Sequence, residues 1–127
     1  MDRKEVNPEA VSPAIGGYSH GIEVGAPARL LFVSGQIPET VDGSTPGSFD
    51  EQCEQVWRNL GAVLEASGMG YENLVKVTTF LTHADQAERN SEIRRRFLGT
   101  LRPALTVVVA QTLESTWLLE IEAVAAA

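Results

Sequence analysis

The spacing of apolar residues predicts a helix in the middle of the chain. Between residues 49 and 67 the apolar side chains recur at steps of three or one, which places them on one stripe of a helix. They are Cys53, Val56, Trp57, Leu60, Val63 and Leu64. Ser48 and Glu51 form a capping box at its start, and Gly68 suits the position just after its end.

Runs of β-branched and aromatic residues predict five strands around this helix and a second one. The first two strands are separated by a Gly-Ala-Pro turn, which favours a hairpin, and two early prolines favour an irregular lead over residues 1–13. The second helix is expected over residues 84–98, with Ala87, Ile93 and Phe97 facing inward. The predicted strands cover residues 16–24, 29–34, 74–81, 104–113 and 117–125. This order favours an α+β layer with both helices on one face of the sheet.

Two of the predicted strands are apolar on both faces. Leu-Leu-Phe-Val at 30–33 and Leu-Thr-Val-Val-Val at 105–109 show no regular exchange of apolar and polar residues. Alternate side chains of a strand point to opposite faces, and two helices cover only one of them. The pattern therefore predicts that another subunit covers the second face.

Composition narrows the class of protein. The 127 residues fit one domain over 1–127, and the net charge of −7 argues against a nucleic-acid partner, because that affinity comes largely from Lys and Arg. A single cysteine, Cys53, excludes an internal disulfide and a cysteine-rich zinc site, and two histidines are too few for a typical structural metal site. The charged start lacks a signal-peptide core, and the apolar runs are too short to span a membrane. We expect a soluble cytoplasmic protein with no cofactor, metal or membrane partner.

Two carboxylates on the last strand are candidates for acid–base chemistry. Glu120 and Glu122 lie two residues apart, so they share one face of an otherwise apolar strand. Burial of a carboxylate is costly without a partner, and one of them could act as a general base or orient a water molecule. The alternative is an exposed edge strand or a salt-bridged pair.

Other polar groups each have both a functional and an ordinary structural interpretation. Tyr18 follows two glycines, which permit close approach of a ligand, but a tyrosine of this kind also serves in packing. Ser34 lies at a strand end, where it lines a site or belongs to a turn. The side chains of residues 94–96, all arginines, point about 100° apart around a helix, so we interpret them as a solvated surface. Cys53 is interpreted as a core residue rather than a nucleophile.

Taken in order, segments along nearly the whole chain resemble the RidA/YjgF family of enamine/imine deaminases, also called the endoribonuclease L-PSP family. The segments are PAIGGY at 13–18, LFVSGQIP at 31–38, NL at 59–60, LEASG at 64–68, VKVTTFL at 75–81, Asn90, RPA at 102–104 and EIEAVA at 120–125. The resemblance implies a chorismate-mutase-like α+β fold, with a six-stranded sheet and two helices on one face. It also implies a homotrimer that binds a small-molecule ligand in clefts between subunits.

The resemblance also implies roles for particular residues. In such deaminases water attacks the C=N carbon of a 2-imino acid, and Glu120 would orient that water. Tyr18 would close the cleft, Ser34 is present at its family position, and Asn90 would support the loop structure. Leu105 stands where the deaminases have the arginine that grips the substrate carboxylate, and Val107 stands where many members have cysteine.

The Leu105 departure predicts an altered ligand. A guanidinium fork binds a carboxylate with two hydrogen bonds, and the loss of both would remove several powers of ten in affinity. Arg102 is a candidate to replace it. Three functions follow: a hydrolase of a small imine, enamine or related reactive carbonyl compound with altered specificity; a non-catalytic binding or regulatory trimer; and an RNA-cleaving protein or translation inhibitor, which the acidic charge disfavours.

Overall fold

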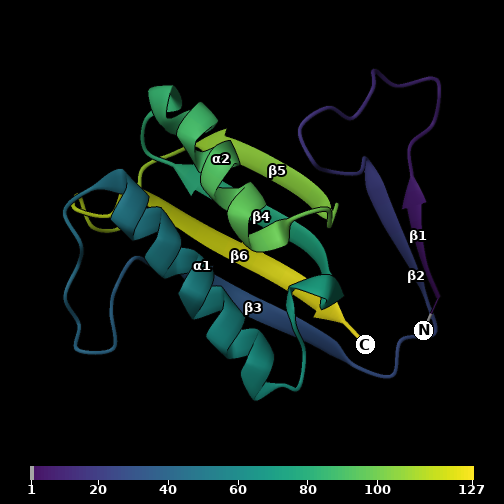
Figure 1. Cartoon of the computed structure of the whole chain (residues 1–127), viewed down its shortest axis with the longest axis horizontal. Helices are drawn as coiled ribbons and strands as arrows, with labels where there is room; N and C mark the ends of the chain where they lie inside the picture. The colour runs from purple at the N-terminus through teal and green to yellow at the C-terminus, as the bar shows by residue number, and fades with distance from the viewer. Residues whose placement is uncertain (1) are drawn as a thin grey trace.

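The computed structural model describes residues 2–127, which form six strands and two α-helices (Figure 1). The elements are β1 (Asp2–Val6), β2 (Gly21–Gly25), β3 (Leu30–Gln36), α1 (Phe49–Ala66), β4 (Leu74–Leu81), α2 (Ala87–Leu98), β5 (Ala104–Val109) and β6 (Leu119–Ala126). Two short 3-10 turns, Tyr71–Asn73 and Ala84–Gln86, lead into β4 and α2. The predicted α+β class with two helices is confirmed.

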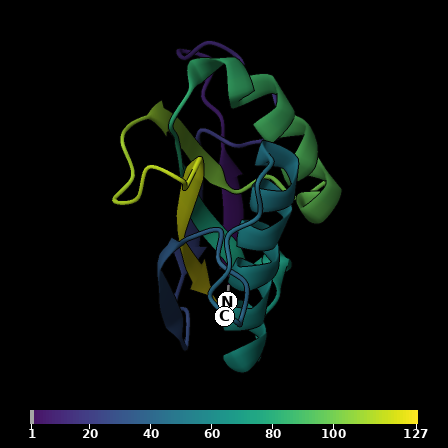
Figure 2. The same cartoon turned by 90° about the vertical axis from the view of Figure 1, so that its left-hand side faces the viewer.

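Four of the strands form one mixed sheet in the order β3-β6-β4-β5. β5 runs parallel to β4, and the remaining pairs are antiparallel. Both helices lie on one side of this sheet (Figure 2). In β6 the side chains alternate accordingly: Leu119, Ile121 and Ala123 are buried beneath the helices, whereas Glu120 and Glu122 point to the opposite face.

The caps of α1 follow the predicted chemistry. Ser48 is the N-cap, and its hydroxyl both accepts from the Glu51 backbone N–H and donates to the Glu51 carboxylate. At the other end Gly68 has a φ of +69°, and the N–H of Met69 reaches back to the Leu64 carbonyl. This is a Schellman motif, which needs a left-handed residue and therefore favours glycine.

The core lies between the helices and the sheet. Trp57 of α1 is fully buried and stacks on Phe97 of α2, with ring centroids 5.9 Å apart. Tyr71 meets both rings edge-on and donates a hydrogen bond of 2.7 Å to the Trp57 carbonyl. A Cβ on Gly61 would lie 2.5 Å from the Tyr71 hydroxyl, so a helix-interior glycine is required for this packing.

The N-terminal region differs from the sequence prediction. Residues 2–6, expected to be irregular, form β1, and β2 pairs with β1 instead of forming a hairpin with β3. The six strands therefore divide into a two-stranded and a four-stranded sheet, rather than one six-stranded sheet (Figure 1). The sequence does not predict β1 because its residues, Asp-Arg-Lys-Glu-Val, show no alternation of apolar and polar side chains. Its partner strand β2 is also distant in sequence. The Arg3 side chain links the two-stranded sheet to the four-stranded one by donating a hydrogen bond of 2.8 Å to the Leu74 carbonyl.

Further boundaries differ, among them the start of β2, which lies at Gly21 rather than at residue 16. Residues 84–86 form a 3-10 turn before α2, which leaves Ala87 exposed rather than facing inward. β5 ends at Val109, four residues before the predicted end, and the chain from there to Leu113 is irregular. Ile93 is buried and Phe97 is half-buried, as predicted.

The face of the four-stranded sheet opposite the helices is rich in exposed apolar side chains. Phe32 of β3 is 73% exposed and pairs with Val124, on the same face as Glu120. Leu30 on the same strand is 53% exposed, and Val108 of β5 is 40% exposed. The prediction that the helices cover only one face is thus confirmed.

Candidate functional site

A cavity of about 470 Å³ lies where α2 and the edge strand β5 meet the segment before β2. Its walls include Tyr18, His20, Ser91, Arg94, Leu105 and Val107. The segment before β2 is distant in sequence from α2 and β5, so tertiary structure brings Tyr18 and His20 to the other lining residues. The cavity unites Tyr18 with Leu105 and Val107.

The segment that carries Tyr18 is held against β5 by its neighbour Ser19. The Ser19 N–H donates to the Pro103 carbonyl at 3.2 Å, and its hydroxyl donates to the Arg102 carbonyl at 2.9 Å. Gly16 and Gly17 precede it with φ values of +117° and +77°. Such a turn is strained for any other residue, so the Gly-Gly pair places Tyr18 beside the start of β5.

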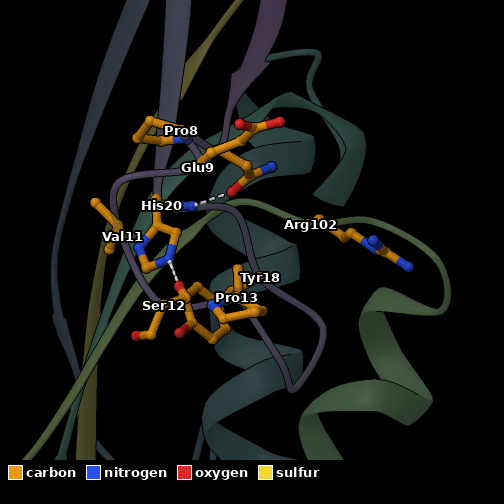
Figure 3. A pocket seen from close by; sticks show the side chains of 10 residues that line it. Pro8, Glu9, Val11, Ser12, Pro13, Tyr18, His20 and Arg102 are labelled. Atoms are coloured by element: carbon orange, nitrogen blue, oxygen red, sulfur yellow. Dashed lines mark hydrogen bonds between the residues drawn. The ribbon is translucent and has the colours of Figure 1, made fainter.

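A second cavity, also about 470 Å³, adjoins the first and shares Tyr18 and His20 with it (Figure 3). The two rings meet edge-to-face with centroids 5.7 Å apart. His20 is fixed at its backbone N–H by the Asn7 side chain at 2.8 Å and at Nε2 by the Ser12 carbonyl at 2.6 Å. Arg102 lines this second cavity, but Figure 3 shows its side chain extending away from His20.

Arg94 is the main departure from the sequence interpretation of the three arginines. Only 6% of Arg94 is exposed, whereas Arg95 and Arg96 are exposed to solvent. Its Nη2 donates to the Gly16 carbonyl at 2.8 Å and to the Ser91 hydroxyl at 3.2 Å. Burial lowers the pKa of Arg94, and the nearby charge of Arg95 lowers that pKa further.

The helical spacing of residues 90–97 indicates that Arg94 lies on the inward face of α2. Asn90, Ile93, Arg94 and Phe97 stand at i, i+3, i+4 and i+7, which is one face of a helix. The divergence of three consecutive arginines does not by itself tell which of them shares this inward face. The prediction of a solvated surface is therefore wrong for Arg94.

Glu120 stands elsewhere, on the open face of the sheet. Its register partner is Phe80, whereas Leu105 pairs with Val77, whose side chain is buried on the helix side. Because paired residues share a face, Glu120 and Leu105 project from opposite faces of the same sheet. Within one chain the Glu120 carboxylate therefore does not line the Tyr18 cavity.

Gly35 provides the space that Glu120 occupies. A Cβ built on Gly35 would overlap the Glu120 carboxylate, with 2.7 Å to its carboxyl carbon. This close approach lies at an irregularity in the pairing of β3 with β6, between Val33 and Gln36. Glu120 is half-buried there and has no hydrogen-bond partner among residues 2–127.

Ser34 and Asn90 occupy two further environments. Ser34, next to Gly35, is exposed at the end of β3. Asn90 is buried on α2, where its Oδ1 lies 3.8 Å from Cys53 Sγ. Cys53 itself is fully buried, and burial raises the pKa of its thiol to about 12. The predicted site residues thus form separate groups around Tyr18, around Glu120 and in the core.

The described residues contain no group of three His, Cys, Asp or Glu side chains placed to hold a metal ion. No helix within residues 2–127 combines the length and apolar character needed to cross a bilayer.

The fold and the two groups of polar residues define a small α+β protein with a cavity at the edge strand and a carboxylate on the open face of the sheet. The chain belongs to the endoribonuclease L-PSP family, which is the RidA/YjgF family: the model of that family matches residues 9–127.

Three proteins illustrate how close the relatives are. Protein DfrA of Myxococcus xanthus is 36% identical over 129 residues, covering 98% of this chain and 96% of its own. The 2-iminobutanoate/2-iminopropanoate deaminase of Rattus norvegicus is 32% identical, with 97% of this chain and 89% of the deaminase covered. The crystal structure of YyfB, a Rid-family protein of Yersinia pestis, superposes with a TM-score of 0.86 at 28% identity over the full length of both chains.

Proposed function

We propose that the protein is a RidA-type hydrolase of a small imine, enamine or related reactive carbonyl metabolite. The observation that carries the proposal is the Glu120 carboxylate, half-buried on an apolar sheet face above Gly35 and without a hydrogen-bond partner among the described residues. A carboxylate held in this way is available to a water molecule. Similarity to a protein that is an imine deaminase, at 32% identity over 97% of this chain, supports the reaction class.

The proposed reaction consumes one water and releases ammonia. Glu120 accepts a proton from water as the water oxygen bonds to the imine carbon, and the proton passes to the imine nitrogen. The resulting carbinolamine loses ammonia as its C–N bond breaks, with the hydroxyl proton transferred to the leaving nitrogen. A carbonyl compound and ammonia remain, and Glu120 returns to its starting state.

The complete site requires more than one copy of the chain. Glu120 and the Tyr18 cavity lie on opposite faces of one sheet, so a substrate touching both must lie between subunits. Exposed Phe32 and Leu30 give the open face an apolar surface suited to such an interface. We propose the homotrimer of the family resemblance as the assembly that closes the site.

Leu105 and Val107 set the specificity in this proposal. Both line the Tyr18 cavity and give its floor a hydrocarbon surface where the deaminases have arginine and many members have cysteine. The Leu105→Arg variant tests this role, because it restores the family's cation. We expect that variant to accept short 2-imino acids better than the wild-type protein does.

The deciding experiment is an imine-hydrolysis assay in which an amino-acid oxidase forms the imine in place and semicarbazide traps what remains. The Glu120→Gln variant should lose about a hundredfold or more of the enzymatic acceleration. Glu122→Gln is the matched control, because Glu122 lies on the same strand and face two residues away and the variant removes the same charge, and it should retain activity. Full activity of Glu120→Gln would contradict the mechanism.

Gly35→Ala gives an independent test of the same carboxylate. The added Cβ would force Glu120 from its position, so hydrolysis should fall even though every titratable group remains. The far-ultraviolet circular dichroism of this variant should match that of the wild-type protein. Activity equal to the wild type would show that the position of Glu120 does not matter.

A non-catalytic binding trimer is the second candidate, favoured by Leu105 in the place of the substrate-binding arginine. It predicts that small ligands raise the Tm of the wild-type protein without any turnover. The assay above distinguishes the two functions, because only the hydrolase accelerates loss of the imine.

A further inference from the structure

We infer that Arg94 is the anion-binding group of the Tyr18 cavity, and that this cavity takes a small monocarboxylate whose hydrocarbon part lies on Leu105 and Val107. The identity of the ligand rests on the proposed function, whereas the anion site rests on the cavity itself. The positive charge that binds the ligand would then belong to Arg94 on α2, rather than to a residue of β5.

The first argument is the charge of Arg94. It is 94% buried, since only 6% of its surface is exposed. The ion pairs among residues 2–127 are formed by the Arg58, Arg89 and Arg96 side chains, and Arg94 takes part in none of them. A buried cation without a counter-ion is costly. Binding of an anion in the cavity would remove that cost.

The second argument is the set of donors that Arg94 leaves free. A guanidinium carries five N–H groups, and in Arg94 the Nη2 group alone donates to both acceptors, the Gly16 carbonyl and the Ser91 hydroxyl. Nε and Nη1 have no hydrogen-bond partner among the described residues, and neither atom is sealed in the interior. Three N–H groups thus remain for a carboxylate, which a guanidinium binds with two parallel hydrogen bonds.

The third argument is the rest of the cavity wall. Ser91 accepts a hydrogen bond from Arg94, so its own hydroxyl proton is free to donate to a ligand oxygen. None of the residues that line the cavity is acidic, and the remainder of the wall is apolar at Ile15, Leu105 and Val107. One uncompensated positive charge beside an apolar surface matches an anion with one charge and a short alkyl chain.

The competing explanation is a purely structural one. The bond from Arg94 to the Gly16 carbonyl also holds the glycine turn, so loss of Arg94 could act on the fold alone. Arg95 provides the matched control: it is the next residue, its guanidinium packs within about 4 Å of the space beside Gly16 and Gly17, and it is exposed. Arg94→Met and Arg95→Met remove the same charge from adjacent positions.

The test is isothermal titration of the full-length protein with 2-oxobutanoate, with butanamide as the uncharged comparison ligand. Wild-type protein and Arg95→Met should bind 2-oxobutanoate alike, and Arg94→Met should raise the Kd by about a hundredfold, as expected for two hydrogen bonds to a charged group. Butanamide should bind all three proteins weakly and equally. Equal binding of 2-oxobutanoate by Arg94→Met, or no binding by the wild type, would overturn the inference.

Two further measurements test the contact between Arg94 and the ligand and the chemical class of that ligand. If Arg94→Met does not fold, the Arg94 Nε–H resonance of the wild-type protein is followed by NMR, and it should shift on addition of 2-oxobutanoate. An unmoved resonance would refute contact between Arg94 and the carboxylate. Inorganic phosphate is titrated in parallel, and tighter binding of phosphate than of 2-oxobutanoate would overturn the assignment to a monocarboxylate.

The hydrolysis assay separates this inference from the proposed function. Binding that depends on Arg94 but without imine turnover would refute the hydrolase and leave the anion site standing. Turnover that is unchanged in Arg94→Met would refute the anion site and leave the hydrolase standing.

Discussion

Phe32 offers a quantitative test of whether a second copy of the chain covers the open face of the sheet. It is 73% exposed in β3, on the face opposite both helices. Full burial of a phenylalanine contributes up to about 3 kcal/mol, so covering the exposed part contributes about 2 kcal/mol per chain. In a trimer three copies contribute about 6 kcal/mol, which corresponds to about four powers of ten in the association constant.

The perturbation is Phe32→Asp, which removes the apolar area and places a carboxylate in the proposed interface. Sedimentation velocity over a series of protein concentrations should show a trimer for the wild type and a shift toward monomer for the variant. Val41→Asp is the control, because Val41 is fully exposed in the loop between β3 and α1 and the variant changes the charge equally. It should sediment like the wild type.

Two results would refute this reasoning. A wild-type chain that is monomeric at micromolar concentration would show that the open face is left uncovered. A trimer unaffected by Phe32→Asp would show that the chains associate through another surface. Either result would contradict the proposal that the site lies between subunits and that Glu120 and Tyr18 contact the same substrate.

Three further predictions concern groups outside the site. Cys53 should not react with a thiol reagent at pH 8 in the native protein, because burial raises its pKa to about 12, and it should react fully after unfolding in guanidinium chloride. Ser48→Ala should lower the free energy of unfolding by about 1 kcal/mol through loss of the N-cap, as measured by denaturant titration. The hydrogen bonds from Arg89 lower the pKa of Asp50 below its ordinary value of 3.8. This pair therefore stabilises the fold at neutral pH, and the stabilisation is lost as the pH falls below 3.8 and through the lowered pKa. Arg89→Met should therefore lower the Tm at pH 7, and the difference from the wild-type Tm should shrink in acid.

Local signals in the sequence identified the elements that are stabilised locally. The helix from Phe49 to Ala66 was found with both caps, because its apolar stripe and its capping residues lie within one segment. Strand β4 was found over Leu74–Leu81 for the same reason: a short β-rich run bounded by turns. Where the signal was weak, as in the charged residues of β1, the sequence did not reveal a strand.

The candidate site likewise contains residues that the sequence indicates and one that only the structure reveals. Strand alternation and the glycine pair indicate Glu120 and Tyr18, and the family resemblance adds Leu105 and Val107. The structure places Tyr18, Leu105 and Val107 around one cavity and Glu120 on the other face of the sheet. No motif indicated Arg94, although its helical spacing from Asn90 was informative. Its burial became visible only when the Gly16 turn was seen packed against α2.

The sequence by itself determined the α+β class, the helices with their principal caps, the apolar character of both faces of β3 and β5, and the absence of arginine at position 105. These properties depend on the order of neighbouring residues and on periods of two and 3.6 along the chain. Only the tertiary structure decided the pairing of β1 with β2, the separation of Glu120 from Leu105 and the burial of Arg94. Each of these depends on contacts between residues far apart in sequence, and side-chain patterns within one segment do not specify the partner of another.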